Sequence, residues 1–236
     1  METPVPAASG DIQYDRLRRN TLIATPVALL VPVAFAAILV ALGADLRWSA
    51  IGFGALGWVS ALMLRAPLAA ILSMVLGDPE RVKPWIVGSS GPIEEGVRLL
   101  VLILVGRSFT EAAMIGVGWA AIEVVYTTMT GFITLSLVKR TDPEAVKARE
   151  MLQSQGMLRE TGPALGVIER IGASALHIGF TLIVAWTPVW VIATALVHSA
   201  VNLSLIETFK KWPLGTELAL LAGGIGAFII GVAVLE

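Results

Sequence analysis

A set of ionisable side chains lies inside long apolar stretches of this sequence. These side chains are Glu94, Glu95, Arg98, Glu123, Glu169, Arg170, His177 and His198, and Asn202 follows one helical turn after the last of them. Placing a charged group in a bilayer costs roughly 2.5–3.5 kcal/mol on insertion scales, so such groups usually face a cavity or one another. The set therefore predicts one polar site inside an otherwise apolar protein.

The spacing of these residues puts several of them on common helix faces. Arg98 follows Glu94 by four residues and Glu95 by three, so it can reach either carboxylate. Two carboxylates beside one arginine leave one negative charge without a positive partner. Either Glu94 or Glu95 is then structural, and the other is free for catalysis. His198 and Asn202 are also four residues apart, on one face.

Two imidazoles with several carboxylates can hydrolyse a bond with or without a metal ion. A catalytic Zn²⁺ commonly has three protein ligands and keeps a fourth position for water. In that alternative the ligands are Glu123, His177 and His198, and Glu95 is the general base on the bound water. In the metal-free alternative Glu95 activates water directly, and His198 and Asn202 donate hydrogen bonds to the developing oxyanion.

The elements that must position these groups are membrane helices. Hydrophobic residues make up 56% of the 236 residues and charged residues only 15%, and the mean hydropathy is +0.80. Water-soluble domains carry about 25% charged residues, and about 20 apolar residues span a bilayer. The sequence predicts an all-α polytopic bundle with about seven transmembrane helices, at 21–42, 49–76, 85–105, 111–138, 163–186, 188–207 and 216–235.

Two prolines refine this layout. Pro67 is expected to break or kink the second helix, which would leave a span over 49–64 and an interfacial remainder. Pro143 is expected to start a short surface helix in the charged loop 139–162. We predict a cytoplasmic tail over 1–20 and a single membrane domain over 21–236, with a catalytic core over about 85–207.

The distribution of basic residues predicts the orientation. Cytoplasmic loops carry an excess of Lys and Arg. With the N-terminus inside, the outer segments hold Arg47 and Arg107, whereas the inner segments hold Arg16, Arg18, Arg19, Arg81, Lys83, Lys139, Arg140, Lys147, Arg149, Arg159, Lys210 and Lys211. In that topology Glu95, Glu123, His177 and His198 all lie about 14 to 22 Å from the cytosolic ends of their helices. This agreement predicts that they share one site.

Composition also excludes several classes of function. The net charge of −1 argues against a nucleic-acid binder that relies on bulk positive charge. The absence of cysteine excludes disulfides, thiolate metal sites and a cysteine nucleophile.

The motifs resemble the YhfC family of intramembrane peptidases, which is similar to the PrsW proteases and, more distantly, to the CAAX prenyl endopeptidase and Abi group. The larger group is marked by a glutamate pair with a following basic residue, an aromatic-x-x-x-His or aromatic-x-x-x-Glu motif, a later histidine, and His-x-x-x-Asn/Asp. The matching residues are Glu94, Glu95 and Arg98, then Trp119 and Glu123, then Glu169, Arg170 and His177, then His198 and Asn202. Glutamate at position 123 follows the PrsW pattern, because the CAAX endopeptidases carry histidine there.

The resemblance implies an intramembrane endopeptidase, of metallo- or glutamic type, in a prokaryotic plasma membrane. Its partners would be the lipid bilayer and a membrane-protein or lipid-associated peptide substrate, with no nucleic acid. Two alternatives stay open. One is a non-enzymatic proton-coupled transporter or channel, because intramembrane Glu and His chains also relay protons. The other is a catalytically inactive membrane scaffold.

Overall fold

The computed structural model describes residues 9–140, 142–154 and 162–236, and all its regular elements are helices. Residues 1–8 of the expected tail and 155–161 of the expected loop lie outside the described residues. The elements are α1 (Ser9–Ala41), α2 (Trp48–Leu76), α3 (Pro79–Gly88), α4 (Ser90–Val105), α5 (Phe109–Lys139), α6 (Pro143–Ser154), α7 (Pro163–Trp186), a 3₁₀ turn η1 (Pro188–Trp190), α8 (Val191–Lys211) and α9 (Pro213–Leu235). The prediction of an all-α polytopic bundle is confirmed.

Six of the described helices are long and apolar enough to cross a membrane: α1, α2, α5, α7, α8 and α9. The expected seventh span, 85–105, is wrong as a continuous helix. The chain forms α3 and α4 there instead, and the 16 residues of α4 fall short of the roughly 20 that a span needs. The break between α3 and α4 shapes the site described below.

The expected helix break at Pro67 is also wrong. α2 runs without interruption from Trp48 to Leu76, with Pro67 inside it. Proline removes one backbone hydrogen bond, and membrane helices tolerate this loss because neighbouring helices and local adjustments satisfy the freed carbonyl. The consequence is that Arg65 lies within a continuous membrane helix instead of at a helix end.

The break between α3 and α4 follows from Pro92 and the serines before it. Pro92 has no N–H, so it cannot bond to the carbonyl of Gly88 four residues earlier. Ser199 of α8 donates its hydroxyl to that carbonyl at 2.6 Å. The hydroxyls of Ser89 and Ser90 donate to the carbonyls of Ile86 and Val87 at 2.8 and 2.7 Å. Side chains thus satisfy the backbone groups that the break would otherwise expose.

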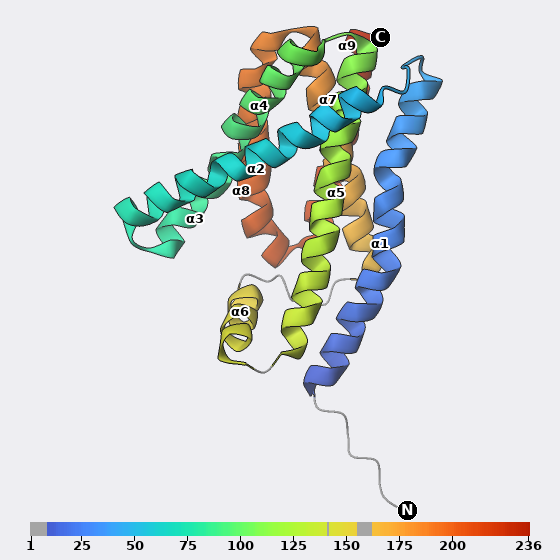
Figure 1. The fold of residues 1–236 in the computed structure, drawn as a ribbon. Coiled ribbons are helices and arrows are strands. Elements are labelled where there is room, and N and C mark those ends of the chain that lie inside the picture. The colour runs from blue at the N-terminus through green and yellow to red at the C-terminus, as the bar shows by residue number, and fades with distance from the viewer. Residues whose placement is uncertain (1–8, 141, 155–161) are drawn as a thin grey trace, which may run out of the picture.

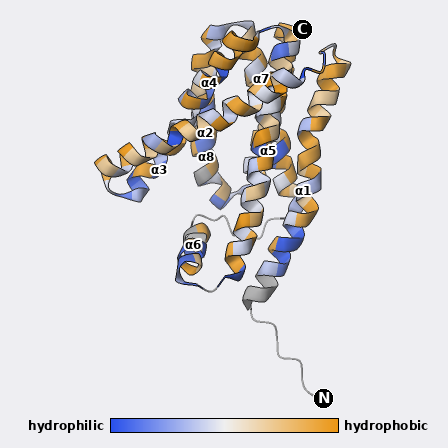
Figure 2. Ribbon diagram, viewed as in Figure 1, coloured by the Kyte–Doolittle hydropathy of each residue, from blue (hydrophilic) through white to orange (hydrophobic). Residues whose placement is uncertain are grey.

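The first and last described helices place their outer ends at opposite ends of the molecule (Figure 1). α1 begins at the end of the molecule where α6 lies, and α9 ends at the opposite end (Figure 1). α1 is hydrophilic near its start and hydrophobic over most of its length (Figure 2). The expected surface helix is confirmed as α6, whose Ala145 N–H is capped by the Asp142 carboxylate at 3.1 Å. The expected tail, by contrast, is helical from Ser9 onward and continuous with α1.

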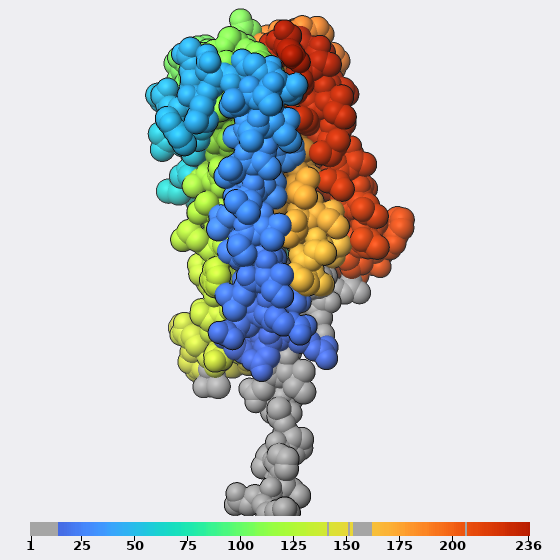
Figure 3. Space-filling view, turned by 90° about the vertical axis from the view of Figure 1, so that its right-hand side faces the viewer, coloured from blue at the N-terminus to red at the C-terminus, as the bar shows by residue number. Residues whose placement is uncertain are grey.

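α7 is the central helix of the bundle. In its most apolar stretch of 18 residues 61% of the residues are buried, the highest fraction among the six long apolar helices. α7 packs against α1, α5 and α9. α1 lies along the outside of the molecule between α5 and α7 (Figure 3). Two glycines of α5 allow close helix approach: a side chain at Gly118 would collide with the backbone of Ile51 in α2, and one at Gly116 with Ile178 in α7. α5 is thereby held close to both helices next to Glu123.

Candidate functional site

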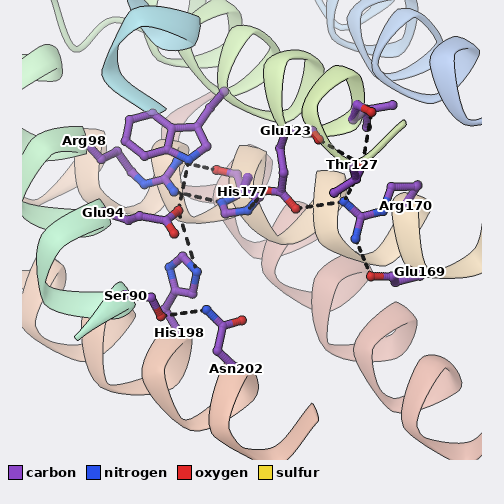
Figure 4. A network of polar contacts seen from close by, with 12 residues as sticks. Ser90, Glu94, Arg98, Glu123, Thr127, Glu169, Arg170, His177, His198 and Asn202 are labelled. Atoms are coloured by element: carbon purple, nitrogen blue, oxygen red, sulfur yellow. Dashed lines mark hydrogen bonds and ion pairs between the residues drawn. The ribbon is translucent and has the colours of Figure 1, made fainter. Parts of the chain in front are cut away.

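Four helices bring the predicted polar residues together inside the bundle, as expected. α4 contributes Glu94, Glu95 and Arg98, α5 contributes Glu123, α7 contributes Glu169, Arg170 and His177, and α8 contributes His198 and Asn202 (Figure 4). The side chains of Glu95 and Arg98 are fully buried, and those of Glu94, His177 and His198 are at most 6% exposed. The convergence predicted from helix depth is confirmed.

Glu95 is held by two neighbours. Arg98 binds it with two hydrogen bonds, Nε to Oε2 at 3.0 Å and Nη2 to Oε1 at 3.1 Å. His198 Nδ1 lies 2.9 Å from Glu95 Oε1. Since an ionised carboxylate only accepts hydrogen bonds, His198 Nδ1 carries the proton and donates it. Glu95 therefore fixes both the orientation and the tautomer of His198.

That tautomer leaves the other nitrogen of His198 with a lone pair. Nε2 faces Glu94 Oε2 at 3.8 Å, which is too long for a direct hydrogen bond. At this distance one water molecule can bridge the two atoms. Glu94 also pairs with Arg65 of α2 through Oε1 and accepts a hydrogen bond from Trp119 Nε1 at Oε2, at 3.3 Å. The indole of Trp119 lies 4.3 Å below the Arg98 guanidinium.

His177 is engaged at both ring nitrogens. Arg98 Nη2 lies 3.0 Å from Nδ1, and because a guanidinium can only donate, Nδ1 accepts. Nε2 therefore carries the proton, and it lies 2.5 Å from Glu123 Oε2. Arg98 Nη1 also donates to the backbone carbonyl of His177 at 3.0 Å and to Thr181 Oγ1 at 2.6 Å. His177 is thus a bridge between Arg98 and Glu123.

Glu123 continues this network toward the start of α7. Its Oε1 accepts a hydrogen bond from Arg170 Nη1 at 2.9 Å, and Arg170 also pairs with Glu169. The carboxylate of Glu169 is 39% exposed, so this end of the network approaches the surface. Glu169 thus pairs with Arg170, its neighbour in the chain, and Arg170 connects it to Glu123.

Asn202, one turn after His198 on α8, binds the start of α4. Its Nδ2 donates to Ser90 Oγ at 2.7 Å, at the start of α4. Beside it, a side chain at Gly91 would collide with the carbonyl of Ala195 in α8. Asn202, Ser90 and Ser199 thus join α4 to α8 along the break before α4, which sets the position of Glu95 against His198.

The group that could hold a metal ion differs from the predicted one. Glu94, His177 and His198 each offer a ligand atom, and these atoms lie within 4.8 Å of one another. The sequence analysis expected Glu123 in the place of Glu94. In the structure Glu123 lies outside that group, because its Oε2 is 2.5 Å from His177 Nε2 and its Oε1 binds Arg170, and spacing within one helix could not show this.

The hydrogen bonds of this group do not fit a bound Zn²⁺ as they stand. A ligating histidine needs a free nitrogen lone pair, but His177 Nδ1 accepts from Arg98 and its Nε2 proton points at Glu123. Two guanidinium groups, Arg65 and Arg98, also lie against the group and would repel a cation. Only His198 presents a lone pair that is not already committed.

Three residues of the site escaped the sequence analysis. Arg65 is not among the residues predicted for the site, and Thr181 lies one turn after His177 on the same face of α7. Glu217 of α9 is the third: it is buried, and its Oε2 has no hydrogen-bond partner in the part of the chain that the structure describes. Both Glu217 and Arg65 are ionisable residues inside predicted apolar spans, and this was the signal that could have identified them.

Comparison of the chain with family models, with curated proteins and with solved structures gave no match in any of the three. The family resemblance therefore depends on the motifs alone, and any reaction assigned to the protein depends on the geometry of the site. The network joins four glutamates, three arginines and two histidines in a connected, largely buried cluster. With neutral histidines its formal charge is −1, which leaves one carboxylate in excess of the guanidinium groups.

Proposed function

We propose that this protein is a membrane-embedded endopeptidase that hydrolyses peptide bonds of membrane-associated proteins. The observation that supports it most is the geometry of His198, whose Nδ1 is oriented by Glu95 while Nε2 faces Glu94 at 3.8 Å. A carboxylate that orients an imidazole, so that the other nitrogen acts as general base, is the arrangement used in hydrolytic triads.

In this proposal the nucleophile is a water molecule between His198 Nε2 and Glu94 Oε2. Nε2 takes a proton from the water as its oxygen attacks the peptide carbonyl carbon. The carbonyl becomes a tetrahedral oxyanion, and His198 then gives the proton to the leaving amine nitrogen as the C–N bond breaks. Glu94 positions the water, and Glu95 stabilises the imidazolium that forms. This assignment exchanges the roles first expected for the two glutamates.

Arg65 is suited to stabilise the oxyanion. Its guanidinium pairs with Glu94, and its Nε is a buried donor without a partner among the residues described. A donor aimed at developing negative charge in a water-poor site typically contributes 10²–10³-fold to the rate. Asn202, by contrast, is bound to Ser90, so in this proposal it positions α8 against α4.

The choice of a peptide bond, and of a prokaryotic plasma membrane as the location, follows the resemblance to YhfC and PrsW proteins. The membrane itself is supported by the six apolar helices. We propose a metal-free reaction over a Zn²⁺-assisted one because of the hydrogen bonds of His177. Elemental analysis of the purified protein tests this choice: stoichiometric zinc that is lost in His198→Ala would overturn it.

The direct test compares wild type with Glu94→Gln in cells and in proteoliposomes. New protein N-termini that appear in membrane proteins when wild type is expressed, and that are absent with Glu94→Gln, would identify substrates. The matched control is Glu111→Gln, the same substitution in the first turn of α5, where Glu111 pairs with Arg47. Cleavage that persists undiminished in Glu94→Gln, or that fails equally in both variants, contradicts the proposal.

A second candidate, a proton-coupled transporter, is favoured by one observation. The network runs without interruption from the partly exposed Glu169 through Arg170, Glu123 and His177 to Arg98. Chains of this kind also carry protons. Proton flux into sealed proteoliposomes, abolished by Glu123→Gln and accompanied by no proteolysis, would support the transporter and reject the hydrolase.

A further inference from the structure

A long apolar cavity lies on the other side of α8 from the interface with α4. It is an open groove lined by residues of α7, α8 and α9, and its volume is about 720 Å³. Along α9 it extends from Gly215 to Ile230, which is about 22 Å at 1.5 Å per residue. We call this cavity the slot. Phe180 lines the slot, and its ring lies 6.3 Å from the ring of His198, so it separates the slot from the polar network.

Missing side chains keep the slot open. A Cβ at Gly223 or Gly226 would meet nothing within 4 Å, although both residues lie on its wall. Apolar cavities of this kind do not hold water. Lining atoms that face an empty space also lose dispersion contacts. In a bilayer the slot is therefore expected to be filled by something apolar.

The slot is too narrow to enclose a helix. A volume of about 720 Å³ over about 22 Å leaves a mean cross-section of about 33 Å². A helix with its side chains is about 10–12 Å across, which corresponds to roughly 80–110 Å². The mean cross-section of the slot is less than half that of such a helix, so a transmembrane segment of another protein does not fit fully within it.

An extended peptide is excluded by its backbone. Each unpaired peptide group in a hydrocarbon environment costs several kcal/mol, and the slot offers few partners. Two of its three hydroxyl-bearing residues, Thr208 and Thr216, already donate to carbonyls of their own helix turns, those of Ser204 and Trp212. A hydrocarbon chain is the occupant that needs no such partners.

Charge at one end of the slot indicates what the chain belongs to. α8 ends in Lys210 and Lys211, and Trp212, which lines the slot, follows at once. Trp212 is 70% exposed, as is typical of tryptophan at a membrane interface. The two lysines outnumber Glu207, the acidic residue of that turn. A basic pair at the interface favours an anionic lipid headgroup.

We propose that the slot binds one acyl chain of an anionic phospholipid, with the headgroup at Lys210 and Lys211. One leaflet is about 15 Å of hydrocarbon thick, so a slot about 22 Å long accommodates the chain over the full depth of its leaflet. The bound chain covers Phe180 from the side opposite to His198. This binding site does not depend on the hydrolase proposal, because none of its lining residues takes part in that reaction.

The test uses the full chain reconstituted in phosphatidylcholine vesicles that contain a little phosphatidylglycerol with a photoreactive group in one acyl chain. After illumination, mass spectrometry locates the labelled residues. We expect labels concentrated on slot residues of α8 and α9, displaced by unlabelled phosphatidylglycerol at lower concentration than by phosphatidylcholine. Labels spread evenly over the lipid-facing helices would overturn the proposal.

Substitutions that fill the slot sharpen this test. Gly223→Leu on α9 and Ala200→Leu on α8 each place a side chain in it from a different wall, so one variant suffices if the other does not fold. We expect each to lower slot labelling by about tenfold. The matched control is Gly52→Leu on α2, where a Cβ also meets nothing within 4 Å but which lies outside the slot. An equal loss in the control contradicts the proposal.

The headgroup is tested separately. Lys210→Gln combined with Lys211→Gln is expected to abolish the preference for phosphatidylglycerol over phosphatidylcholine while labelling by either lipid stays within the slot. An unchanged preference would show that the lysines do not hold the headgroup. Cross-links from the slot to a second copy of the chain, in place of lipid labels, would likewise reject the proposed occupant.

Discussion

The polar network has two halves that use the same residue types differently. In the half between α5 and α7, Glu123 and His177 bond to each other and to Arg170 and Arg98, so all four nitrogen and oxygen atoms of the two side chains have a close partner. In the half between α4 and α8, Glu95 holds only one nitrogen of His198, and the other faces Glu94 at 3.8 Å.

This difference indicates where chemistry can occur. A histidine with both nitrogens committed must break a buried hydrogen bond before it can take a proton from water, whereas His198 keeps a basic lone pair. In the proposed hydrolase the half between α5 and α7 is therefore structural, and the half between α4 and α8 carries the reaction. Arg98 joins the two, because it bonds to Glu95 on one side and to His177 on the other.

The sharpest test makes the same substitution at both histidines. In His177→Gln the amide oxygen can accept from Arg98 and the amide nitrogen can donate to Glu123, so we expect the cleavage rate to stay within about tenfold of wild type. In His198→Gln the amide can donate to Glu95 but offers no basic lone pair, so we expect a loss of about 10²–10⁴-fold. Cleavage rates in proteoliposomes measure both, and equal losses would remove the distinction between the halves.

The next effect is on stability. Arg98→Met leaves Glu95 as a buried charge without its guanidinium, and losses of about 3–5 kcal/mol are typical when one partner of a buried pair is removed. Reversible unfolding in mixed micelles measures this change. Glu95→Leu with Arg98→Met removes both charges and is expected to recover part of the loss. If the double variant is less stable than Arg98→Met alone, Arg98 does not act mainly through Glu95.

A smaller effect tests how the break before α4 positions the reactive half. Ser199→Ala leaves the carbonyl of Gly88 without its donor and is expected to cost about 1–3 kcal/mol. Pro92→Ala restores a backbone N–H that can reach that carbonyl, so the double variant should regain stability in the same unfolding measurement. No recovery would mean that Pro92 is not the cause of the break.

The sequence predicts the existence of this site better than its internal pairing. Burying charges in lipid is costly enough to force Glu95, Glu123, His177 and His198 together, and their depth in separate helices already indicates this. Spacing rules relate residues of one helix only. They could not show that Arg65 from α2 would pair with Glu94, or that Arg170 would bind the second carboxylate oxygen of Glu123.

The same limit explains the errors in the helices. Hydropathy averages over a window, so the apolar stretch 85–105 hid a break that depends on Pro92 and on a serine hydroxyl from α8. At Pro67 a break was predicted where the helix is continuous. The rule that proline breaks a helix comes from soluble proteins, and it overstates the free-energy cost of a proline inside a membrane helix. In both cases the deciding partner lies outside the local sequence.

The smallest single effect is expected at Thr127, in a comparison of two threonines that each donate to their own helix and accept from an arginine. Thr181 Oγ1 lies 2.6 Å from Arg98 and is fully buried, whereas Thr127 Oγ1 lies 3.4 Å from Arg170. Valine keeps the shape of threonine but accepts nothing, so we expect Thr181→Val to cost about 1.5–3 kcal/mol and Thr127→Val less than about 0.5 kcal/mol. Unfolding measurements on both variants decide this. A larger cost at Thr127 would mean that the network is anchored at Arg170 instead of at Arg98, and the junction between the two halves would have to be reassigned.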